Sequence, residues 1–417
     1  MVMFEINTLP NGVRIICEKM PHVRSAAVGI FIDVGSRDEA PTENGSAHFI
    51  EHMLFKRTSA HSAAELAFAM DAIGGQINAY TTRENTCFYA RVLDTHLNTA
   101  VDLLTEMFFD CAFDESETGS ERGVILEEIG MYEDTPDDAC YERLMSGCFK
   151  GALGRPVLGK PSTLEKMSGE SLKGFKESRY TAGRIIISLC GNYEDSHLER
   201  IKERFSGMEK TRRVKRKSTL YGTTVSVRRK KTEQNQFCLA FPSNEVSSDD
   251  RFAMNLLTTI LGGGVSSRLF QNIREKYGLC YSIFAFQSCF SDAGILSVAT
   301  AVNKETEMRT LGLIGDELKR FLDGGVDEDE LSRAREQAKS ALVMSLESTN
   351  SRMLKMGNSL LALGKCLTPD ELLERYDTVT STEILSLAQK RLDFKQLSFS
   401  ALGKTKGAED YIKALGL

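Results

Sequence analysis

The two halves of this 417-residue chain follow the same order of expected strands and helices, and this repeat limits the fold more than any other feature. Late in the first half, a helical segment at Thr163–Met167 is followed by a polar-faced helix and the apolar strand Ile185–Cys190. Leu373–Asp377, a similar helix and the strand Leu397–Leu402 repeat this series near the end of the chain. A repeat of about 200 residues indicates two copies of one domain. We therefore expect an α+β fold with two duplicated domains, each a mostly antiparallel sheet packed with helices.

A basic run, Lys210–Lys217, separates the two copies. Its cations could bind nucleic acid, but the formal net charge of −6 and the absence of aromatic residues within the run favour a solvated linker. The chain is also long enough for two domains with separate cores. The expected division is residues 1–209 for the first domain, 210–222 for the linker and 223–417 for the second domain.

The composition limits the compartment and the partners. The first residues show no basic stretch followed by an apolar run, so we expect no secretory signal. The most apolar short run, Ile185–Cys190, is too short to span a bilayer. The ten cysteines form no Cys-x-x-Cys pair and are typical of reduced core residues. We expect a cytoplasmic protein of bacterial type, with neither nucleic acid nor a membrane as its partner.

The segment His48-Phe49-Ile50-Glu51-His52 carries the clearest chemistry. On a helix, the two histidines lie one turn apart and Glu51 shares their face. Two neutral imidazoles at this spacing can hold a zinc ion, and the carboxylate can reach a water on it; H-x-x-E-H is a known zinc-protease pattern. The apolar neighbours also allow a second interpretation, in which the two histidines belong to an ordinary buried helix face. The second half has no such motif.

Two acidic residues on a later helix could complete such a site. Glu121 and Glu128 are seven residues apart on a helix expected from Glu117 to about Glu133, so they share one face, whereas Glu127 points elsewhere. Acidic residues on helices are most often simply solvated. Taken alone, this pair therefore predicts no site, and it becomes a candidate only in combination with the histidines.

These residues together resemble the M16 family of zinc metallopeptidases (pitrilysin- or insulinase-like), over essentially the whole chain. The length is similar to that of the short two-domain members, such as the catalytic subunit of mitochondrial processing peptidase and bacterial processing-protease-like proteins. The resemblance implies domains of the LuxS/MPP-like metallohydrolase type. In the segment Val124–Glu128, Glu128 matches the family's third metal ligand. Glu121 matches its second acidic position, which orders the site without binding the metal.

Gly75–Glu84 resembles the family's active-site edge strand, and Gln76–Thr81 and Thr86–Leu93 are expected strands on either side of a polar turn. The resemblance implies strand addition of an extended, unfolded peptide. The residues implied to hold this peptide are Asn78, Ala79 and Tyr80. The implied ligands of one Zn²⁺ per chain are His48, His52 and Glu128, with Glu51 as the general base of a metalloendopeptidase that acts inside a closed chamber.

In the second half, Ser266–Tyr281 is similar to the family's arginine–tyrosine element. By this resemblance, Arg274 would hold a carbonyl of the peptide substrate and Tyr281 would donate to the oxyanion. Because one polypeptide has both this element and the metal motif, we predict a homodimer in which Arg274 and Tyr281 complete the partner's site.

Two alternatives of other classes remain. A catalytically silent scaffold of the same fold would typically lose the metal motif, whereas every ligand position is filled here. A small-molecule metallohydrolase leaves the duplicated second half unexplained. Within that half, Gly262-Gly263-Gly264 fits either a simple helix stop or a mobile loop that steers substrate.

Overall fold

The computed structural model describes residues 4–211 and 215–415. Residues 212–214 of the expected linker lie outside the described residues. The chain forms two compact units. The first unit comprises Met1–Ile129, Arg155–Lys217 and Val343–Thr368, and the second comprises Gly130–Gly154, Ser218–Leu342 and Pro369–Leu417.

A six-stranded sheet of order β1-β2-β6-β3-β5-β4 forms the centre of the first unit. Only the β2–β6 pair is parallel, and the other neighbours in this sheet are antiparallel. Strand β4 lies at one edge of the sheet and pairs with β5. The strands are β1 (Glu5–Thr8), β2 (Arg14–Lys19), β3 (Ser25–Ile32), β4 (Gln76–Thr81), β5 (Thr86–Leu93) and β6 (Ile185–Gly191).

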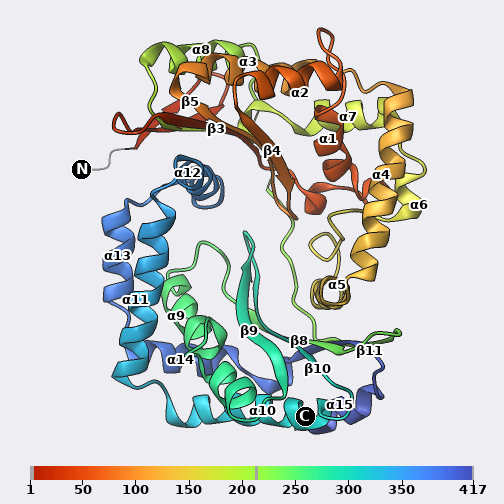
Figure 1. Ribbon diagram of the computed structural model, residues 1–417, viewed down its shortest axis with the longest axis vertical. Coiled ribbons are helices and arrows are strands. Elements are labelled where there is room, and N and C mark those ends of the chain that lie inside the picture. Colours follow the sequence, from red (N-terminus) through yellow and green to blue (C-terminus); the bar gives the residue numbers. More distant parts are fainter. Residues whose placement is uncertain (1–3, 212–214, 416–417) are drawn as a thin grey trace. The chain divides into compact units, whose positions relative to one another are not determined.

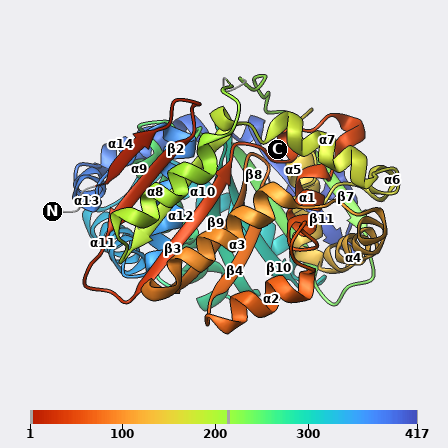
Figure 2. The same cartoon turned by 90° about the horizontal axis from the view of Figure 1, so that it is seen from above.

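Helices cover both faces of this sheet. In Figure 1, α2, α3 and α8 lie on one side of the strands and α12 lies on the other, and Figure 2 shows α3 and α8 side by side. The helices of this unit are α1 (Ser46–Leu54), α2 (Ala63–Ala72), α3 (Leu97–Asp110), α6 (Pro161–Leu164), α7 (Gly169–Arg179), α8 (Asp195–Ser206) and α12 (Thr349–Leu363), while α4 (Glu115–Asp134) crosses from the first unit into the second.

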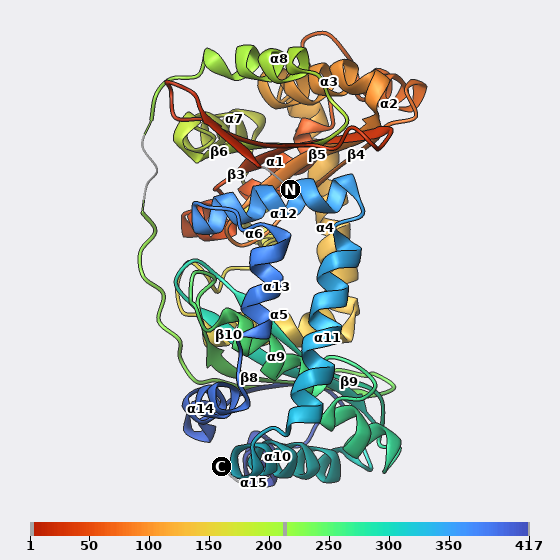
Figure 3. The same cartoon turned by 90° about the vertical axis from the view of Figure 1, so that its left-hand side faces the viewer.

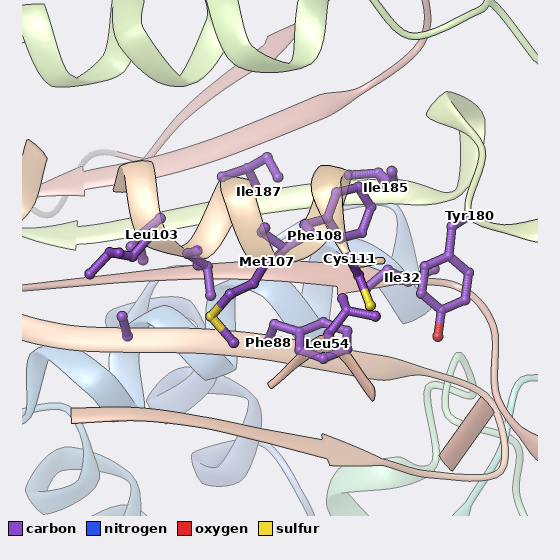
Figure 4. Packing of buried hydrophobic residues seen from close by; sticks show 14 of the residues in the cluster. Ile32, Leu54, Phe88, Leu103, Met107, Phe108, Cys111, Tyr180, Ile185 and Ile187 are labelled. Atoms are coloured by element: carbon purple, nitrogen blue, oxygen red, sulfur yellow. The ribbon is translucent and has the colours of Figure 1, made fainter. Parts of the chain in front are cut away.

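Alternating side chains of the strands supply two apolar layers, because successive residues of a strand point to opposite faces. On one face, Leu103, Met107 and Phe108 of α3 pack with Ile185 and Ile187 of β6, as Figure 4 shows. On the other face, the buried side chains of α12 cover those of β2, β3 and β6. This second layer contains Ile16, Ala27, Phe31, Ile186, Met353, Met356 and Leu360.

The second unit repeats the plan of the first. Its five strands have the order β7-β11-β8-β10-β9, with β7 and β11 parallel and the other neighbours antiparallel. Paired in chain order with β2-β6-β3-β5-β4, each strand has the same neighbours and directions, so the expected duplicated α+β fold is confirmed. The strands are β7 (Val225–Arg229), β8 (Asn235–Ser243), β9 (Cys280–Cys289), β10 (Gly294–Val302) and β11 (Ser398–Gly403).

The helices of the second unit come between its strands in an order similar to that of the first unit. They are α5 (Pro136–Cys148), α9 (Arg251–Gly262), α10 (Glu307–Gly324), α13 (Pro369–Asp377), α14 (Ser381–Arg391) and α15 (Ala408–Ala414), and α11 (Glu328–Ser345) ends in the first unit. No helix among the described residues is both long enough and apolar enough to cross a bilayer.

Each unit contains one helix that comes from the other half of the sequence. Helix α5 packs its buried Cys140 and Leu144 with residues of β8 and β11, and α12 packs on β3 and β6. The two helices occupy equivalent places in the repeat, since α5 follows α4 and α12 follows α11 (Figure 3). The expected division into 1–209, 210–222 and 223–417 describes the repeat in the sequence and stays a prediction. The compact units do not follow it, because each unit also contains a segment from the other half of the sequence.

The described part of the basic run departs from the expected solvated linker. The side chain of Arg216 is only 13% exposed and lies 2.9 Å from Asp33 and 2.7 Å from Asp38. Arg37 also donates to the backbone oxygen of Lys217. The run therefore ends in a segment that is bound to the first unit by buried ion pairs.

Candidate metal centre

The N-terminus of helix α1 is capped by the buried side chain of Glu39, because the N-cap residue is a glycine and has no side chain to do so. Gly45 stands at its N-cap with φ of +105°, a conformation that favours glycine. The carboxylate of Glu39 accepts hydrogen bonds from the backbone N–H groups of Gly45 and Ala47, at 2.9 and 2.8 Å. It thus satisfies donors that a helix start leaves unpaired. The first turn is fixed immediately before His48.

Three ligand atoms converge between α1 and α4. The Nε2 atoms of His48 and His52 are 3.3 Å apart, and Oε2 of Glu128 lies 3.7 and 3.5 Å from them, respectively. In a tetrahedral site with zinc–nitrogen and zinc–oxygen bonds near 2.0–2.1 Å, ligand atoms are about 3.3 Å apart. Two imidazoles and one carboxylate also match the ligand types that zinc accepts. The residues therefore fit the metal that the sequence predicts.

The ionisation of the site suits a cation. Burial, and to a smaller extent the neighbouring His52, lowers the pKa of His48 to about 3. The imidazole of His48 is thus neutral at pH 7, as a metal ligand must be.

Glu121 orients the second histidine. Its Oε1 lies 2.8 Å from Nδ1 of His52, and its Oε2 lies 2.6 Å from Nζ of Lys56. Burial alone would raise the pKa of Glu121, but the hydrogen bonds from Lys56 and His52 outweigh it and lower this pKa. An ionised Glu121 accepts the Nδ1–H of His52, which leaves Nε2 free to bind a metal. The sequence does not indicate this role of Lys56, because its contact with Glu121 depends on how the two helices pack.

The side chain of Glu51 faces the same site and is hydrogen-bonded to a residue of the sheet. Its Oε2 accepts a hydrogen bond from the hydroxyl of Thr81, the last residue of β4. Burial is the main cause that raises the pKa of Glu51. A raised pKa suits a group that must take up a proton and release it again. Sequence reasoning also missed Thr81, because no spacing rule relates two residues that are thirty positions apart.

The comparisons with known proteins agree with this geometry. The sequence model of Insulinase (Peptidase family M16) matches residues 14–161, and that of the Peptidase M16 inactive domain matches residues 166–338. The chain belongs to peptidase family M16. It is 40% identical to the "Uncharacterized zinc protease YmxG" of Bacillus subtilis, over 93% of this chain and 95% of that protein. It is 37% identical to the "Uncharacterized zinc protease SCO5738" of Streptomyces coelicolor, over 96% and 89%.

Solved structures show the same M16 fold. A crystal structure described as the peptidase M16 inactive domain from Pseudomonas fluorescens superposes with a TM-score of 0.90 at 18% identity, covering 97% of this chain and 99% of that one. The crystal structure of a protease from Helicobacter pylori superposes with a TM-score of 0.88 at 19% identity, covering 97% and 100%. The expected fold class is therefore confirmed along almost the whole chain.

The edge strand of this M16 member lies beside α1, the helix that carries the two histidines. Strand β4 pairs Asn78 with Tyr89 and Ala79 with Phe88, both on β5, and β4 is the last strand in the sheet order. Its other backbone edge is therefore not paired within the sheet. The side chain of Tyr80 turns toward α12, where its hydroxyl lies 3.1 Å from the amide nitrogen of Asn358. The backbone of Asn78 and Ala79 thus lies at this edge, whereas the side chain of Tyr80 contacts α12.

The arginine–tyrosine element lies in the second unit. Arg274 belongs to a π-helical turn at Phe270–Glu275, where its guanidinium pairs with Glu275 and stacks 4.9 Å from the ring centre of Phe270. Tyr281 is the second residue of β9, and it is 83% exposed. The roles of Arg274 and Tyr281 toward the metal site stay predictions.

Proposed function

We propose that this member of family M16 is a zinc-dependent endopeptidase that hydrolyses extended, unfolded peptides. The observation that carries the proposal is the convergence of His48, His52 and Glu128 at the separations of a tetrahedral zinc site, with Glu51 on the same helix face. One ion per chain would be held by these three side chains, which leaves a fourth position for water. A scaffold without activity gives no reason to keep all of these groups.

The chain's own residues would divide the reaction as follows. A bound zinc ion would supply a polarised water whose pKa falls to about 7. Glu51 would take the proton of this water and pass it to the leaving amine. Glu121 would keep the Nδ1 proton of His52 in place, so that Nε2 remains available. The helix-capping Glu39 would hold the first turn of α1 steady during these steps.

The substrate class follows from β4. Its open backbone edge at Asn78 and Ala79 would add a peptide as a further strand, which only an extended segment can form. Main-chain pairing reads the backbone more than the side chains, so cleavage would have a broad preference. Arg274 and Tyr281 would contact the reacting part of this peptide from the second half of a chain.

Substitution of the general base tests the proposal. Glu51→Gln should retain zinc, because the three ligands are unchanged, and should lose nearly all cleavage of quenched peptide libraries. Elemental analysis gives the zinc content, and a chelator should abolish the wild-type activity. A Glu51→Gln protein that cleaves at close to the wild-type rate would remove this assignment, and a wild-type protein that purifies and reconstitutes without zinc would favour the scaffold.

We further propose a homodimer in which Arg274 and Tyr281 serve the partner's metal site. Glu51→Gln and Arg274→Ala chains, each inactive alone, should then regain activity when co-refolded. In a statistical mixture, half of the dimers would carry one intact site of two, so about a quarter of the wild-type rate is expected. If the mixture stays inactive while both proteins fold, the two elements act within one chain.

A further inference from the structure

The hydroxyl of Thr81 donates a hydrogen bond to only one of the two carboxylate oxygens of Glu51. That oxygen is Oε2. The other oxygen, Oε1, has no hydrogen-bond partner among residues 4–211 and 215–415. The carboxylate thus has one oxygen fixed by the protein and one left for a ligand. A hydrogen bond from the protein holds this half-buried carboxylate in one orientation more firmly than packing alone would.

The single hydrogen of the Thr81 hydroxyl is committed to Glu51. The hydroxyl of Thr86 lies 3.4 Å from that of Thr81, but Thr86 donates its own hydrogen to the backbone oxygen of Val34 at 3.0 Å. The hydroxyl oxygen of Thr86 can therefore only accept from Thr81, so Thr86 and Glu51 are the two possible acceptors of the Thr81 proton. The desolvated carboxylate of Glu51 is the better acceptor, because charge-assisted hydrogen bonds are stronger than neutral ones.

The backbone on both sides of Thr81 is fixed. Thr81 pairs with Thr86 across β4 and β5. The next residues, Thr82 and Arg83, accept hydrogen bonds from the backbone N–H groups of Ser36 and Arg37, at 3.3 and 2.8 Å. A Cβ added to Gly35 would come within 2.3 Å of the Thr82 oxygen, which shows how closely these segments approach. Thr81 is a rigid support for the group that it holds.

We propose that Thr81 is a positioning residue for Glu51, which turns the free oxygen of this carboxylate toward the reacting water. The inference rests on the proposed peptidase function. It adds that the base is held by the same strand, β4, whose edge would bind the peptide. Displacement of the peptide-binding strand would thus displace the base with it.

Two substitutions at Thr81 test this role. Thr81→Val keeps the branched shape of the side chain and removes the hydroxyl, so kcat should fall about 10- to 100-fold, the range typical of supporting residues in metal sites. KM should stay within twofold, because the backbone of β4 is unchanged. Thr81→Ser restores the hydroxyl and should return kcat to within about threefold of wild type. Thr95→Val, at an exposed threonine outside the site, is the matched control and should leave kcat unchanged.

Zinc affinity and thermal melting provide readouts that do not depend on turnover. All variants should bind zinc as tightly as wild type in competition with a chromophoric chelator, because Thr81 does not contact the three ligands. The inference is overturned if Thr81→Val keeps full kcat, if only KM changes, or if Thr81→Ser is as slow as Thr81→Val at equal stability. Failure of the peptidase function is a different result, in which the wild type itself shows no zinc-dependent cleavage.

Discussion

His48 and His52 lie one turn apart on α1, yet their surroundings differ. His52 donates through Nδ1 to Glu121 at 2.8 Å. The Nδ1 atom of His48 is buried and has no hydrogen-bond partner among residues 4–211 and 215–415. His52 is therefore oriented by a hydrogen bond, whereas His48 is held by packing within the first unit. A metal would bind each ring through Nε2 of the neutral imidazole.

The burial of His48 predicts a loss of stability in acid for the metal-free protein. Its pKa is lowered to about 3 from an ordinary value of 6.5, so between these values the unfolded chain binds a proton that the folded chain does not. This group's stabilising contribution is present above pH 6.5 and is lost as the pH falls toward 3, with a slope of up to about 1.4 kcal/mol per pH unit. Urea unfolding at several pH values, for wild type and His48→Gln without metal, measures this slope.

The His48→Gln protein is the control, because its carboxylates and its remaining histidines are also present in the wild type. We expect the free energy of unfolding to fall more steeply in wild type than in His48→Gln as the solution is acidified. Equal slopes would show that His48 is protonated in the folded protein.

The sequence could predict some of these residues and not others, for physical reasons. The spacing of His48, Glu51 and His52 places them on one helix face, because 3.6 residues per turn is a local property. Glu128 needed the family resemblance, since acidic residues on a helix are common without a ligand. Thr81 could not be found from the sequence, because its hydrogen bond depends on how β4 packs against α1.

At the scale of elements, the end of the basic run is part of the first unit's structure. Arg216 lies between Asp33 and Asp38 and donates to the backbone oxygen of Glu84, in the turn that follows β4, at 2.7 Å. The side chains of Asp33 and Asp38 are only 5% and 6% exposed. Removal of a buried cation leaves such carboxylates with less compensation for their lost hydration.

Arg216→Gln should therefore destabilise the protein by about 3 kcal/mol, as expected when one partner of a buried ion pair is removed. Chemical denaturation gives the free energy of unfolding. Lys215→Gln, at the exposed neighbouring position, removes the same charge and should change it by less than about 0.5 kcal/mol. If the two substitutions have equal effects, the ion pairs of Arg216 do not stabilise the protein and this segment behaves as the solvated linker that the sequence predicts.

Helices α5 and α12 show a limit of predicting secondary structure and packing from the sequence. The sequence predicts β4 and β5 with the bounds that the structure has. Helices α5 and α12 are not among the predicted elements, although Met353, Met356 and Leu360 of α12 recur at helical spacing. Periodicity indicates that one face of a helix is buried, but it carries no information about which sheet covers that face.

At the scale of the whole molecule, the exchange of these helices makes the two halves of the sequence depend on each other. The strand face that contains Ile16, Phe31 and Ile186 is covered by α12, which the second half of the sequence supplies. Burial of each large apolar side chain contributes about 1.5–3 kcal/mol. The buried Met353, Met356 and Leu360 together thus contribute about 5–9 kcal/mol, which is comparable with the whole stability of a typical domain, about 5–15 kcal/mol.

A fragment of residues 1–217, which contains all three metal ligands, should therefore neither melt cooperatively nor bind zinc with the affinity of the full chain. Co-expression with residues 218–417 should restore both properties, because the second fragment carries α12. In the full chain, Met353→Ala should cost about 2–5 kcal/mol, whereas Met344→Ala, at a side chain that is 69% exposed, should cost less than about 0.5 kcal/mol. Calorimetry and zinc titration measure these effects. If the first fragment folds and binds zinc like the full chain, the contacts of α12 are dispensable and the first half of the sequence is an independent domain.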